Sequence, residues 1–496
     1  MMYSHSIGRA VRCFPEHAAL ACEGRRTTFR ELHQHVAGIA AGLKNHGFEI
    51  GSRLAILLPN EPDYIEIVLA CSWLGVIAVP LNTRLSSKEI DRILSDATPH
   101  GLIRHSSLPA PTASVPWQRI LDLDSIQSQT ESPAEPIYNP QATLALIYTS
   151  GTTGRPKGAI LSHQNILAHV LHLASGFSYA EGDVHLHAAP LFHIIDFPLI
   201  FTCAAYGACQ VTIPKFSPHD FCSAVERERV THATLVPTMI NLLTQYPEIT
   251  KFDLTSLTHL AYGGSPMAPE LIRRTRQQFP DLKLTQAYGL TETGPLATLQ
   301  DHEHAEPRLT SCGRAGIGVD LRVMDESGRE VEIGKLGEFV ARGHNVITGY
   351  WNNPEDTTSA FRDGMFRTGD IGYQDVEGYA YILDRLKDMI DTGGEKVFSS
   401  EVEAVILAHP AVSEVAVYGI PDPQWGEIVV ASVVLKPGQA LGADELIAYC
   451  KRSLAHYKAP RRVEFCESTL PKNATGKILK RVLRERYWAP MERAVN

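Results

Sequence analysis

The chain has 496 residues, of which 44% are hydrophobic and 20% are charged, as is typical of a globular protein with two or three domains. Its 46 basic and 55 acidic residues give a net charge of −9, which excludes the basic excess that is typical of nucleic-acid-binding proteins. The nine cysteines are odd in number and form no Cys-x-x-Cys pair, which argues against a disulfide framework and for a reducing compartment.

Residues 27–80 alternate between helix and strand patterns. Thr28 and Glu31 form a capping box, which contributes about 1 kcal/mol to a helix start, and apolar residues then recur at helical spacing. Short apolar runs at 54–58 and 76–79 predict buried strands with a helix between them. This βαβ order predicts a parallel sheet covered by helices on both faces.

The next part of the chain repeats this rhythm after a polar connection over residues 106–141. The patterns predict strands at 144–148, 209–213, 232–236, 257–261 and 283–287, and helices at 164–173, 219–229, 237–245 and 268–278. Residues 312–383 differ, because glycines separate short strands such as 319–323 and 337–342. This pattern indicates an antiparallel, barrel-like layer.

The last part of the chain, from about residue 388, predicts a small α+β unit. Ser400 and Glu403 form a second capping box in front of a helix. The clearest strand patterns lie at 412–418 and 428–435.

Residues 147–158, with the sequence Ile-Tyr-Thr-Ser-Gly-Thr-Thr-Gly-Arg-Pro-Lys-Gly, concentrate groups that bind anions. Glycine amides, hydroxyls and the cations Arg155 and Lys157 suit a loop that grips a polyphosphate. The spacing differs from a Walker loop, because Lys157 is preceded by Pro156 and followed by Gly158. An ordinary surface turn is the alternative. The candidate ATP-binding residues here are Thr149, Ser150, Gly151, Thr152, Thr153, Gly154 and Lys157.

This stretch closely resembles the signature loop of the adenylate-forming superfamily, and the chain looks most like its acyl-CoA synthetase and 4-coumarate-CoA ligase branch. In that family the loop holds the pyrophosphate end of ATP. The resemblance implies an α/β fold with a large N-terminal domain, residues 1–386, built from two parallel-rich sheet subdomains and the barrel-like layer. It also implies a small mobile α+β C-terminal domain, residues 387–496, with a hinge near Lys387.

Two further motifs follow predicted strands, Tyr-Gly-Gly-Ser-Pro at 262–266 and Ala-Tyr-Gly-Leu-Thr-Glu-Thr-Gly at 287–294. Loops at the carboxyl ends of adjacent parallel strands bind ligands in open α/β folds. Tyr288 offers a ring face for adenine, and Glu292 offers a hard oxygen ligand for Mg²⁺, with a solvated loop carboxylate as the alternative. The resemblance assigns ATP contacts to Gly263, Gly264, Ser265, Ala287, Tyr288 and Gly289, and catalytic roles to Thr291 and Glu292.

The family's remaining nucleotide contacts match three residues in the C-terminal third of the chain. The resemblance implies that Asp370 accepts hydrogen bonds from the ribose hydroxyls and that Arg385 meets the ribose and a phosphate; a salt-bridged linker is the alternative. Lys477, on a glycine-containing loop, matches the lysine that neutralises charge during adenylation.

A turn with two adjacent glycines matches the segment that lines the pantetheine tunnel in CoA ligases. The implied CoA-binding residues are Gly393, Gly394, Glu395 and Lys396. Lys396, Phe398 and Ser399 depart from the family's commoner Asn-Val-Tyr-Pro version of this segment.

The expected acyl pocket is mostly apolar and holds no cation for a second carboxylate, so we expect a monocarboxylic acid, either aliphatic or aryl. Its candidate residues are His193, Ile194, Ile195, Asp196, Val236, Met239, Tyr262, Gly263, Gly289, Leu290 and Leu296. His193, which the family places beside the acyl carboxylate, has a buried core histidine as its alternative reading. Asp196 is unusual beside a hydrocarbon tail and is expected to face a hydroxyl group or water.

These patterns predict an ATP- and Mg²⁺-dependent ligase that makes an acyl-CoA through an acyl adenylate. The alternatives are a stand-alone enzyme that loads a carrier protein and a nucleotide-binding regulator without catalysis. The predicted partners are the acid, ATP and CoA, with no nucleic acid and no integral membrane segment. Because no secretion signal is apparent, we expect a cytoplasmic protein. We also expect a monomer or a homodimer.

Overall fold

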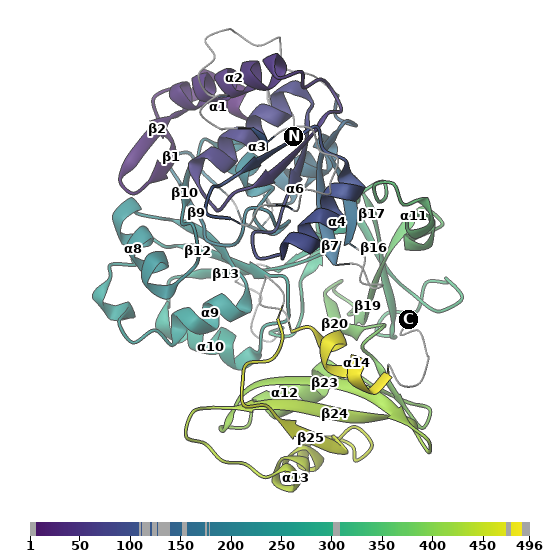
Figure 1. Ribbon diagram of the computed structural model, residues 1–496. Helices are drawn as coiled ribbons and strands as arrows, with labels where there is room; N and C mark the ends of the chain where they lie inside the picture. Colours follow the sequence, from purple (N-terminus) through teal and green to yellow (C-terminus); the bar gives the residue numbers. More distant parts are fainter. Residues whose placement is uncertain are drawn as a thin grey trace. The chain divides into compact units, whose positions relative to one another are not determined.

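The computed structural model describes residues 6–108, 111, 120–121, 126, 139–150, 156–173, 176–177, 179–300, 308–472 and 478–488 (Figure 1). The chain divides into two compact units. The larger unit comprises residues 1–321 and 341–367, and the smaller unit comprises residues 322–340 and 368–496. The predicted domain boundary at residue 386 stays a prediction.

The first sheet of the larger unit has the strand order β6-β5-β3-β4-β7-β8 in the described residues. Its strands are β3 (Arg53–Leu57), β4 (Ile77–Pro80), β5 (Gly101–Arg104), β6 (Ile120–Leu121), β7 (Thr143–Ser150) and β8 (Pro156–Ser162). All neighbouring pairs are parallel except β7 and β8, which are antiparallel. The predicted parallel arrangement is therefore confirmed for the strands at 54–58 and 76–79.

The second sheet of the larger unit has the order β15-β14-β13-β12-β11-β9-β10-β1-β2. Its strands are β1 (Ala18–Cys22), β2 (Arg25–Thr28), β9 (Val184–His187), β10 (Cys209–Thr212), β11 (His232–Leu235), β12 (His259–Gly263), β13 (Lys283–Tyr288), β14 (Thr298–Gln300) and β15 (Arg314–Ala315). The central strands from β1 to β13 run parallel, and antiparallel strands β2, β14 and β15 close the two edges.

Helices cover these sheets, and α8, α9 and α10 lie beside β12 and β13 (Figure 1). The helices of the larger unit are α1 (Ile7–Cys13), α2 (Phe29–Asn45), α3 (Pro62–Leu74), α4 (Ser87–Ala97), α6 (His163–Leu173), α7 (Leu199–Tyr206), α8 (Pro218–Glu228), α9 (Pro237–Thr244), α10 (Pro269–Gln278) and α11 (Pro354–Ala360), with 3₁₀ turns η2 (Ile249–Lys251) and η3 (Thr291–Thr293). The capping box of α2 is confirmed, since Thr28 accepts from the Glu31 amide and Glu31 accepts from the Thr28 amide. Helix α3 is mostly apolar and almost wholly buried, as expected of a helix inside a large core.

The glycine-punctuated region forms a sheet with the order β16-β17-β19-β18, and β20 pairs with β19. Its strands are β16 (Val319–Met324), β17 (Gly337–Gly343), β18 (Phe361–Arg362), β19 (Met365–Gln374) and β20 (Ala380–Arg385). Strand β19 is antiparallel to both β18 and β20, as the sequence predicts. The boundaries between the two units, after residues 321, 340 and 367, fall within β16, β17 and β19.

The smaller unit contains a further sheet with the order β22-β21-β24-β23, and β25 pairs with β24. Its elements are β21 (Ile390–Thr392), β22 (Glu395–Val397), α12 (Ser399–Leu407), β23 (Val412–Asp422), β24 (Gly426–Leu435), α13 (Ala443–Ser453), β25 (Arg462–Phe465) and α14 (Lys480–Trp488). The predicted strands at 412–418 and 428–435 are confirmed as the long antiparallel pair β23 and β24. Their apolar faces pack with α12 and α13 in one core.

The predicted capping box of Ser400 and Glu403 is wrong. Helix α12 begins at Ser399, and its N-cap residue Phe398 makes no side-chain cap. The Ser400 hydroxyl instead donates to the carbonyl oxygen of Leu383, and Glu403 forms a 2.8 Å ion pair with Lys480. Tertiary partners distant in sequence therefore take both side chains away from the helix terminus.

The segment after the predicted phosphate loop differs from the expected loop before a helix. Residues 156–162 form β8, which pairs with β7 from Thr143↔Ser162 to Ser150↔Pro156, and only then does α6 begin. Residue propensities do not predict this strand, because Pro156 and Gly158 are both of types that are uncommon in strands.

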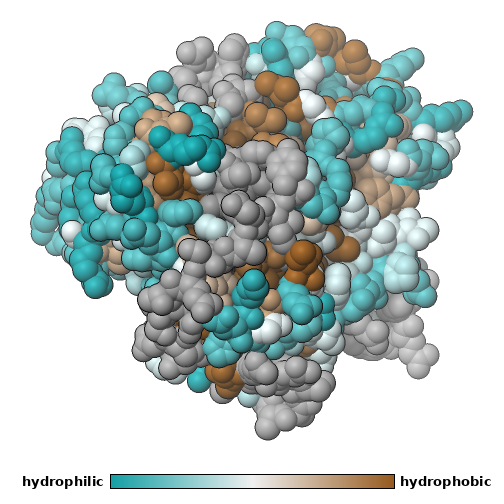
Figure 2. Space-filling model, turned by 90° about the horizontal axis from the view of Figure 1, so that it is seen from above, coloured by the Kyte–Doolittle hydropathy of each residue, from teal (hydrophilic) through white to brown (hydrophobic). Residues whose placement is uncertain are grey.

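The surface shows the usual mixture of residue types. On the face drawn in Figure 2, hydrophobic residues form separate patches bordered by hydrophilic ones. Within the described ranges, no helix is both long and apolar enough to cross a membrane.

Candidate active site

The β7–β8 hairpin of the larger unit carries the first predicted ATP contacts. Thr149 on β7 lies opposite Lys157 on β8. The Lys157 Nζ is 2.7 Å from a carboxylate oxygen of Asp356 and 5.4 Å from the centre of the Tyr350 ring. The predicted residues Gly151, Thr152, Thr153 and Gly154 lie outside the described residues, as does the side chain of Ser150. A cation therefore lies at the loop end of this hairpin, with an acidic partner that the sequence analysis did not identify.

Tyr350 links this hairpin to Glu292. Backbone pairing of Ala159 with Tyr350, and a 2.8 Å hydrogen bond from the Trp351 amide to the Gly158 carbonyl, hold the 350–351 segment beside β8. The Tyr350 hydroxyl donates a 2.8 Å hydrogen bond to Oε1 of Glu292. Glu292 is buried, so this hydrogen bond supports a carboxylate that has little contact with water. Lys157 and Glu292, predicted from separate motifs, are thus brought to two sides of one tyrosine.

Hydrogen bonds to its backbone carbonyl groups hold the turn that carries Thr291 and Glu292. The buried side chain of Asn345 donates 2.8 Å hydrogen bonds to the carbonyl oxygens of Thr293 and Leu296. The Ile347 amide donates to the carbonyl oxygen of Glu292 at 3.0 Å. Gly289 is required here, because a Cβ at this position would lie 1.6 Å from the carbonyl oxygen of Pro295. The Tyr-Gly-x-Thr-Glu motif is therefore shaped by contacts with the 345–347 segment.

The glycine pair at the end of β12 lies beside the end of β13, as the sequence predicts for adjacent parallel strands. Gly263 is opposite Ala287, and a Cβ on Gly263 would lie 2.3 Å from the Ala287 carbonyl oxygen. Gly264 has a φ of +78°, which glycine adopts readily. Ser265 and Tyr288 are both half-buried at this edge. The structure thus brings together the two motifs expected to contact the nucleotide.

The predicted acyl-pocket residues are only partly brought together. A Cβ on Gly264 would lie 3.7 Å from Val236 and 3.8 Å from Ile195, so these three positions are neighbours. The hydrophobic cluster around them also contains Met239 and Tyr262. Leu296 and Ile194 pack against two other clusters, and Leu290 is half-buried at the start of η3. The adjoining set of Ile195, Val236, Met239 and Tyr262 is the best-defined apolar wall.

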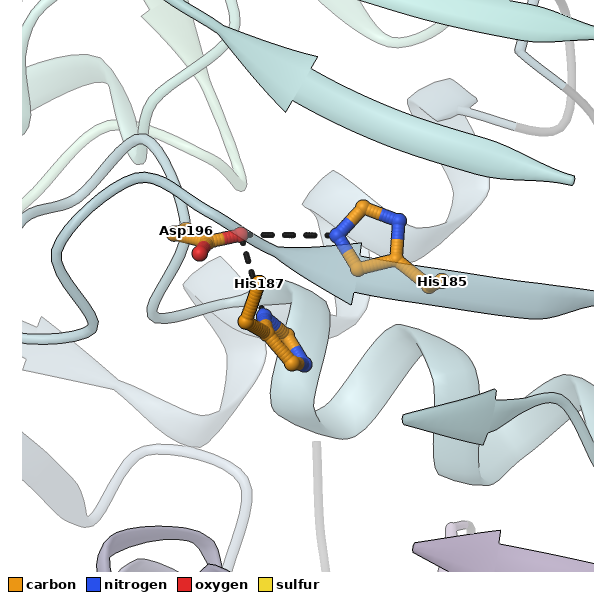
Figure 3. A group of neighbouring side chains, drawn as sticks. All are labelled: His185, His187 and Asp196. Atoms are coloured by element: carbon orange, nitrogen blue, oxygen red, sulfur yellow. Dashed lines mark ion pairs between the residues drawn. The ribbon is translucent and has the colours of Figure 1, made fainter. Parts of the chain in front are cut away.

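His193 and Asp196 lie in the turn between β9 and α7. Burial lowers the pKa of His193 to about 4, and its Nε2 has no hydrogen-bond partner within the described part of the chain. Asp196 is fully buried, so the expectation that it faces water is wrong. Its Oδ1 lies 3.1 Å from Nδ1 of His187 and 3.5 Å from Nε2 of His185 (Figure 3). The two histidines were not predicted, although their i, i+2 spacing on a buried strand was a usable signal.

Asp370 and Arg385 are neighbours in the smaller unit. They are paired residues of β19 and β20, and the Arg385 Nε lies 2.7 Å from the Asp370 carboxylate. Asp370 is buried, whereas Arg385 is half-buried. The carboxylate and guanidinium predicted for the nucleotide therefore contact each other.

The CoA-binding turn predicted at Gly393 and Gly394 is a two-residue hairpin between β21 and β22. Both residues have positive φ, +65° and +87°, as a type I′ turn requires. The turn alone explains the two glycines, so their presence is no separate evidence for CoA. Residues 393–396 are exposed, and the Lys396 Nζ forms a 2.8 Å ion pair with Asp391.

Lys387 lies in the turn after β20, where its carbonyl oxygen accepts a 3.0 Å hydrogen bond from Arg484. Lys477 lies outside the described residues.

Comparisons with known proteins identify the family of this chain. The AMP-binding enzyme family matches residues 7–351, and the AMP-binding enzyme C-terminal domain matches residues 401–477. A feruloyl-CoA synthase from an Amycolatopsis species is 38% identical over 97% of this chain and 98% of its own length. A fatty acid–[acyl-carrier-protein] ligase, ScoC from Streptomyces coeruleorubidus, is 34% identical over 97% of this chain and 96% of its own.

A solved structure provides a third comparison. The o-succinylbenzoate CoA synthetase of Bacillus subtilis, in complex with an acyl-adenylate intermediate, superimposes with a TM-score of 0.88 at 33% identity, covering 96% of this chain and 97% of that one. The same enzyme has also been solved with ATP and a magnesium ion.

Proposed function

This chain belongs to the AMP-binding enzyme family, and from that premise we propose that it is an AMP-forming acyl-CoA synthetase that acts on a monocarboxylic acid. The observation that carries the proposal is the placing of Lys157 and Glu292 on two sides of Tyr350. Such a site offers a cation for phosphate oxygens and a carboxylate for a metal ion.

The proposed reaction has two steps. A carboxylate oxygen of the acid attacks the α-phosphorus of ATP, the bond to pyrophosphate breaks, and an acyl adenylate forms. The thiol sulfur of CoA then attacks the acyl carbon, the thiol loses its proton, and AMP leaves. The side chains position the reactants and neutralise charge, so no residue needs to act as a covalent nucleophile.

The proposed roles in ATP binding follow the sequence motifs that each unit carries. In the larger unit, Thr149, Ser150, Lys157 and the glycines Gly151 and Gly154 hold phosphates. Tyr288 with Ala287 supports adenine. In the smaller unit, Asp370 accepts from the ribose and Arg385 meets the ribose and a phosphate. Lys477 is the proposed adenylation lysine. The Asp370–Arg385 ion pair supports their joint role, because each residue holds the other in place.

Glu292 fits the magnesium ion that accompanies ATP. One of its carboxylate oxygens accepts a hydrogen bond from Tyr350, which orients the group, and carboxylate oxygens are preferred Mg²⁺ ligands. When bound, the ion would neutralise phosphate charge. The part played by the chain itself is to orient the Glu292 carboxylate through the hydrogen bond from Tyr350.

The apolar wall of Ile195, Val236, Met239 and Tyr262 supports an aryl or aliphatic acid with one carboxylate. A panel of aliphatic, aryl and dicarboxylic acids, assayed by pyrophosphate release, tests this. We expect the highest kcat/KM with an aryl or medium- to long-chain monocarboxylate. A dicarboxylate such as malonate that reacts in preference to every monocarboxylate would overturn the proposed substrate class.

The proposed acceptor of the acyl group is CoA. The exposed hairpin that carries Gly393, Gly394, Glu395 and Lys396 is the proposed contact for CoA, and the similarity to a carrier-protein ligase supports the alternative acceptor. Purified protein with a reactive acid, ATP and CoA alone should form the thioester. Pyrophosphate release without any CoA thioester would identify the carrier-loading alternative.

We further propose that residues 387–496 rotate as a domain between the two steps, with the hinge at Lys387. The cytoplasm is the proposed location, because all nine cysteines are free. A monomer or homodimer remains the proposed assembly state, and sedimentation analysis would distinguish the two.

A further inference from the structure

Three buried side chains converge where β9 passes the turn in front of α7. They are His185 and His187 on β9 and Asp196 in the turn (Figure 3). All three side chains are fully buried, and their ligand atoms lie within 4.8 Å of one another. The expected acyl pocket does not account for this group, because Asp196 contacts the histidines and not solvent.

The strand geometry explains why the two histidines meet one carboxylate. Residues two apart in a strand point to the same face, so His185 and His187 are neighbours on one side of β9. This strand lies between β10 and β11 in the interior of the sheet, where apolar residues are the rule. Two imidazoles and a carboxylate at such a place need compensating partners, since burying them alone is unfavourable.

The outer nitrogen of each imidazole already has a partner. The His185 Nδ1 is 2.9 Å from the Tyr179 hydroxyl, and the His187 Nε2 is 3.0 Å from Oε1 of Gln210. The amide oxygen of Gln210 can accept from the His187 Nε2, which leaves the His187 Nδ1 facing Asp196. Outer partners of this kind orient metal-binding histidines in proteins.

The inner atoms, in contrast, lack hydrogen bonds. The His185 Nε2, the His187 Nδ1 and both carboxylate oxygens of Asp196 have no hydrogen-bond partner in the part of the chain that the structure describes. The His187 Nδ1 and the Asp196 Oδ1 are 3.1 Å apart but are not aligned as a donor and an acceptor. Buried nitrogen and carboxylate atoms without hydrogen bonds are costly, and one bound cation would satisfy all of them at once.

We propose that His185 Nε2, His187 Nδ1 and the Asp196 carboxylate bind a divalent transition-metal ion, with zinc as the best match. Two imidazoles and one carboxylate are a common zinc donor set. Ligands at about 2.0–2.1 Å in a tetrahedron are roughly 3.3–3.4 Å apart. The two nitrogen–oxygen separations, 3.1 and 3.5 Å, lie on either side of this value, and the two nitrogens lie within 4.8 Å of each other.

This site is structural and independent of the ATP and Mg²⁺ chemistry. It ties β9 to the turn in which the amides of Asp196 and Phe197 donate to the His193 carbonyl oxygen at 3.1 and 2.9 Å. The metal would therefore fix the turn that carries His193 and Ile195. Loss of the metal should lower the thermal stability of the protein whether or not the proposed ligase activity is correct.

The test is the metal content of the full-length protein expressed in zinc-supplemented medium, because a buried site is filled during folding. We expect about one zinc per chain by plasma mass spectrometry, and X-ray absorption showing two imidazole nitrogens in the zinc shell. His187→Gln and Asp196→Asn should each lower the zinc content at least tenfold. The matched control is His169→Gln, which changes a buried histidine outside the cluster.

Two results would overturn the proposal. Folded wild-type protein with less than a tenth of an equivalent of zinc, after expression with zinc or with cobalt, would show that His187 and Asp196 form a buried ion pair without metal. Zinc that persists in both ligand variants would place the metal elsewhere. Because the first result uses wild-type protein, it does not depend on whether the variants fold.

Discussion

The hydroxyl of Tyr350 donates a 2.8 Å hydrogen bond to Oε1 of Glu292, a residue 58 positions earlier in the chain. The tyrosine ring also faces Lys157, the cation of the predicted phosphate loop. One side chain therefore supports two residues that the proposed function assigns to phosphate and magnesium.

Removing that hydroxyl should weaken the use of Mg-ATP. A hydrogen bond to a charged group contributes about 1.5–3 kcal/mol, so Tyr350→Phe should lower kcat/KM for ATP roughly tenfold to a hundredfold and raise the Mg²⁺ concentration needed for half-maximal rate. Pyrophosphate release measured across a Mg²⁺ titration checks this. Tyr457→Phe, at an exposed tyrosine, is the control. An unchanged Mg²⁺ requirement in Tyr350→Phe would contradict the role of this hydrogen bond.

Lys477→Ala should separate the two half-reactions. A cation at the α-phosphate helps only while the acyl adenylate forms, so adenylation should fall by at least a hundredfold while thioester formation from supplied acyl-AMP stays near normal. Arg481→Ala, which removes another cation close to Lys477 in the sequence, is the control. Equal losses in both half-reactions would show that Lys477 has a different function.

Lys387→Pro should have the opposite effect. The amide of Lys387 donates no hydrogen bond that the structure records in the described residues, so proline at this position breaks none. It does fix φ near −65° and restricts the backbone of Leu386. Acid-dependent pyrophosphate release should persist and CoA thioester formation should fall at least tenfold, as measured on the two half-reactions separately. Lys387→Ala, which leaves the backbone free, is the control. Near-normal thioester formation in the proline variant would place the hinge elsewhere.

Alanine at the Gly393–Gly394 turn should destabilise the protein to different extents. Both positions have positive φ, which strains an L-residue such as alanine by about 1 kcal/mol or more. A Cβ on Gly393 would also lie 2.8 Å from the Trp425 ring, whereas one on Gly394 would meet nothing within 4 Å. Gly393→Ala should therefore lower the free energy of unfolding more than Gly394→Ala, as measured with denaturant. Equal losses would mean that the Trp425 ring moves aside.

Acid should destabilise the protein partly through His169. Burial lowers the pKa of this histidine from 6.5 to about 3, and both its ring nitrogens lack partners in the described chain. Because the folded-state pKa is depressed, its contribution to stability is complete above pH 6.5 and is lost as the pH falls from 6.5 toward 3, by up to about 1.4 kcal/mol per pH unit.

His169→Gln should therefore show a shallower fall in the free energy of unfolding between pH 6.5 and 4 than the wild type. His46→Gln is the control. Parallel pH profiles for wild type and His169→Gln would mean that His169 is protonated equally in the folded and unfolded states.

Local signals in the sequence were sufficient for much of the fold. The alternation of helix and strand, the Thr28–Glu31 capping box and the buried runs of β3, β4 and β11 depend on neighbouring residues, so a reading of the chain predicts them. The adjacency of Gly263 and Ala287 was also predictable, because parallel strands bring their carboxyl ends to one edge.

Contacts between distant segments were decided by the tertiary structure alone. Strand β8 exists because it pairs with β7, although proline and glycine at its start argue against a strand. Ser400 and Glu403 fit a capping box locally but are held by Leu383 and Lys480 instead. The hydrogen bond of Tyr350 with Glu292, and the meeting of Asp196 with His185 and His187, join residues that no sequence pattern relates, because their partners are set by how strands and turns pack in three dimensions.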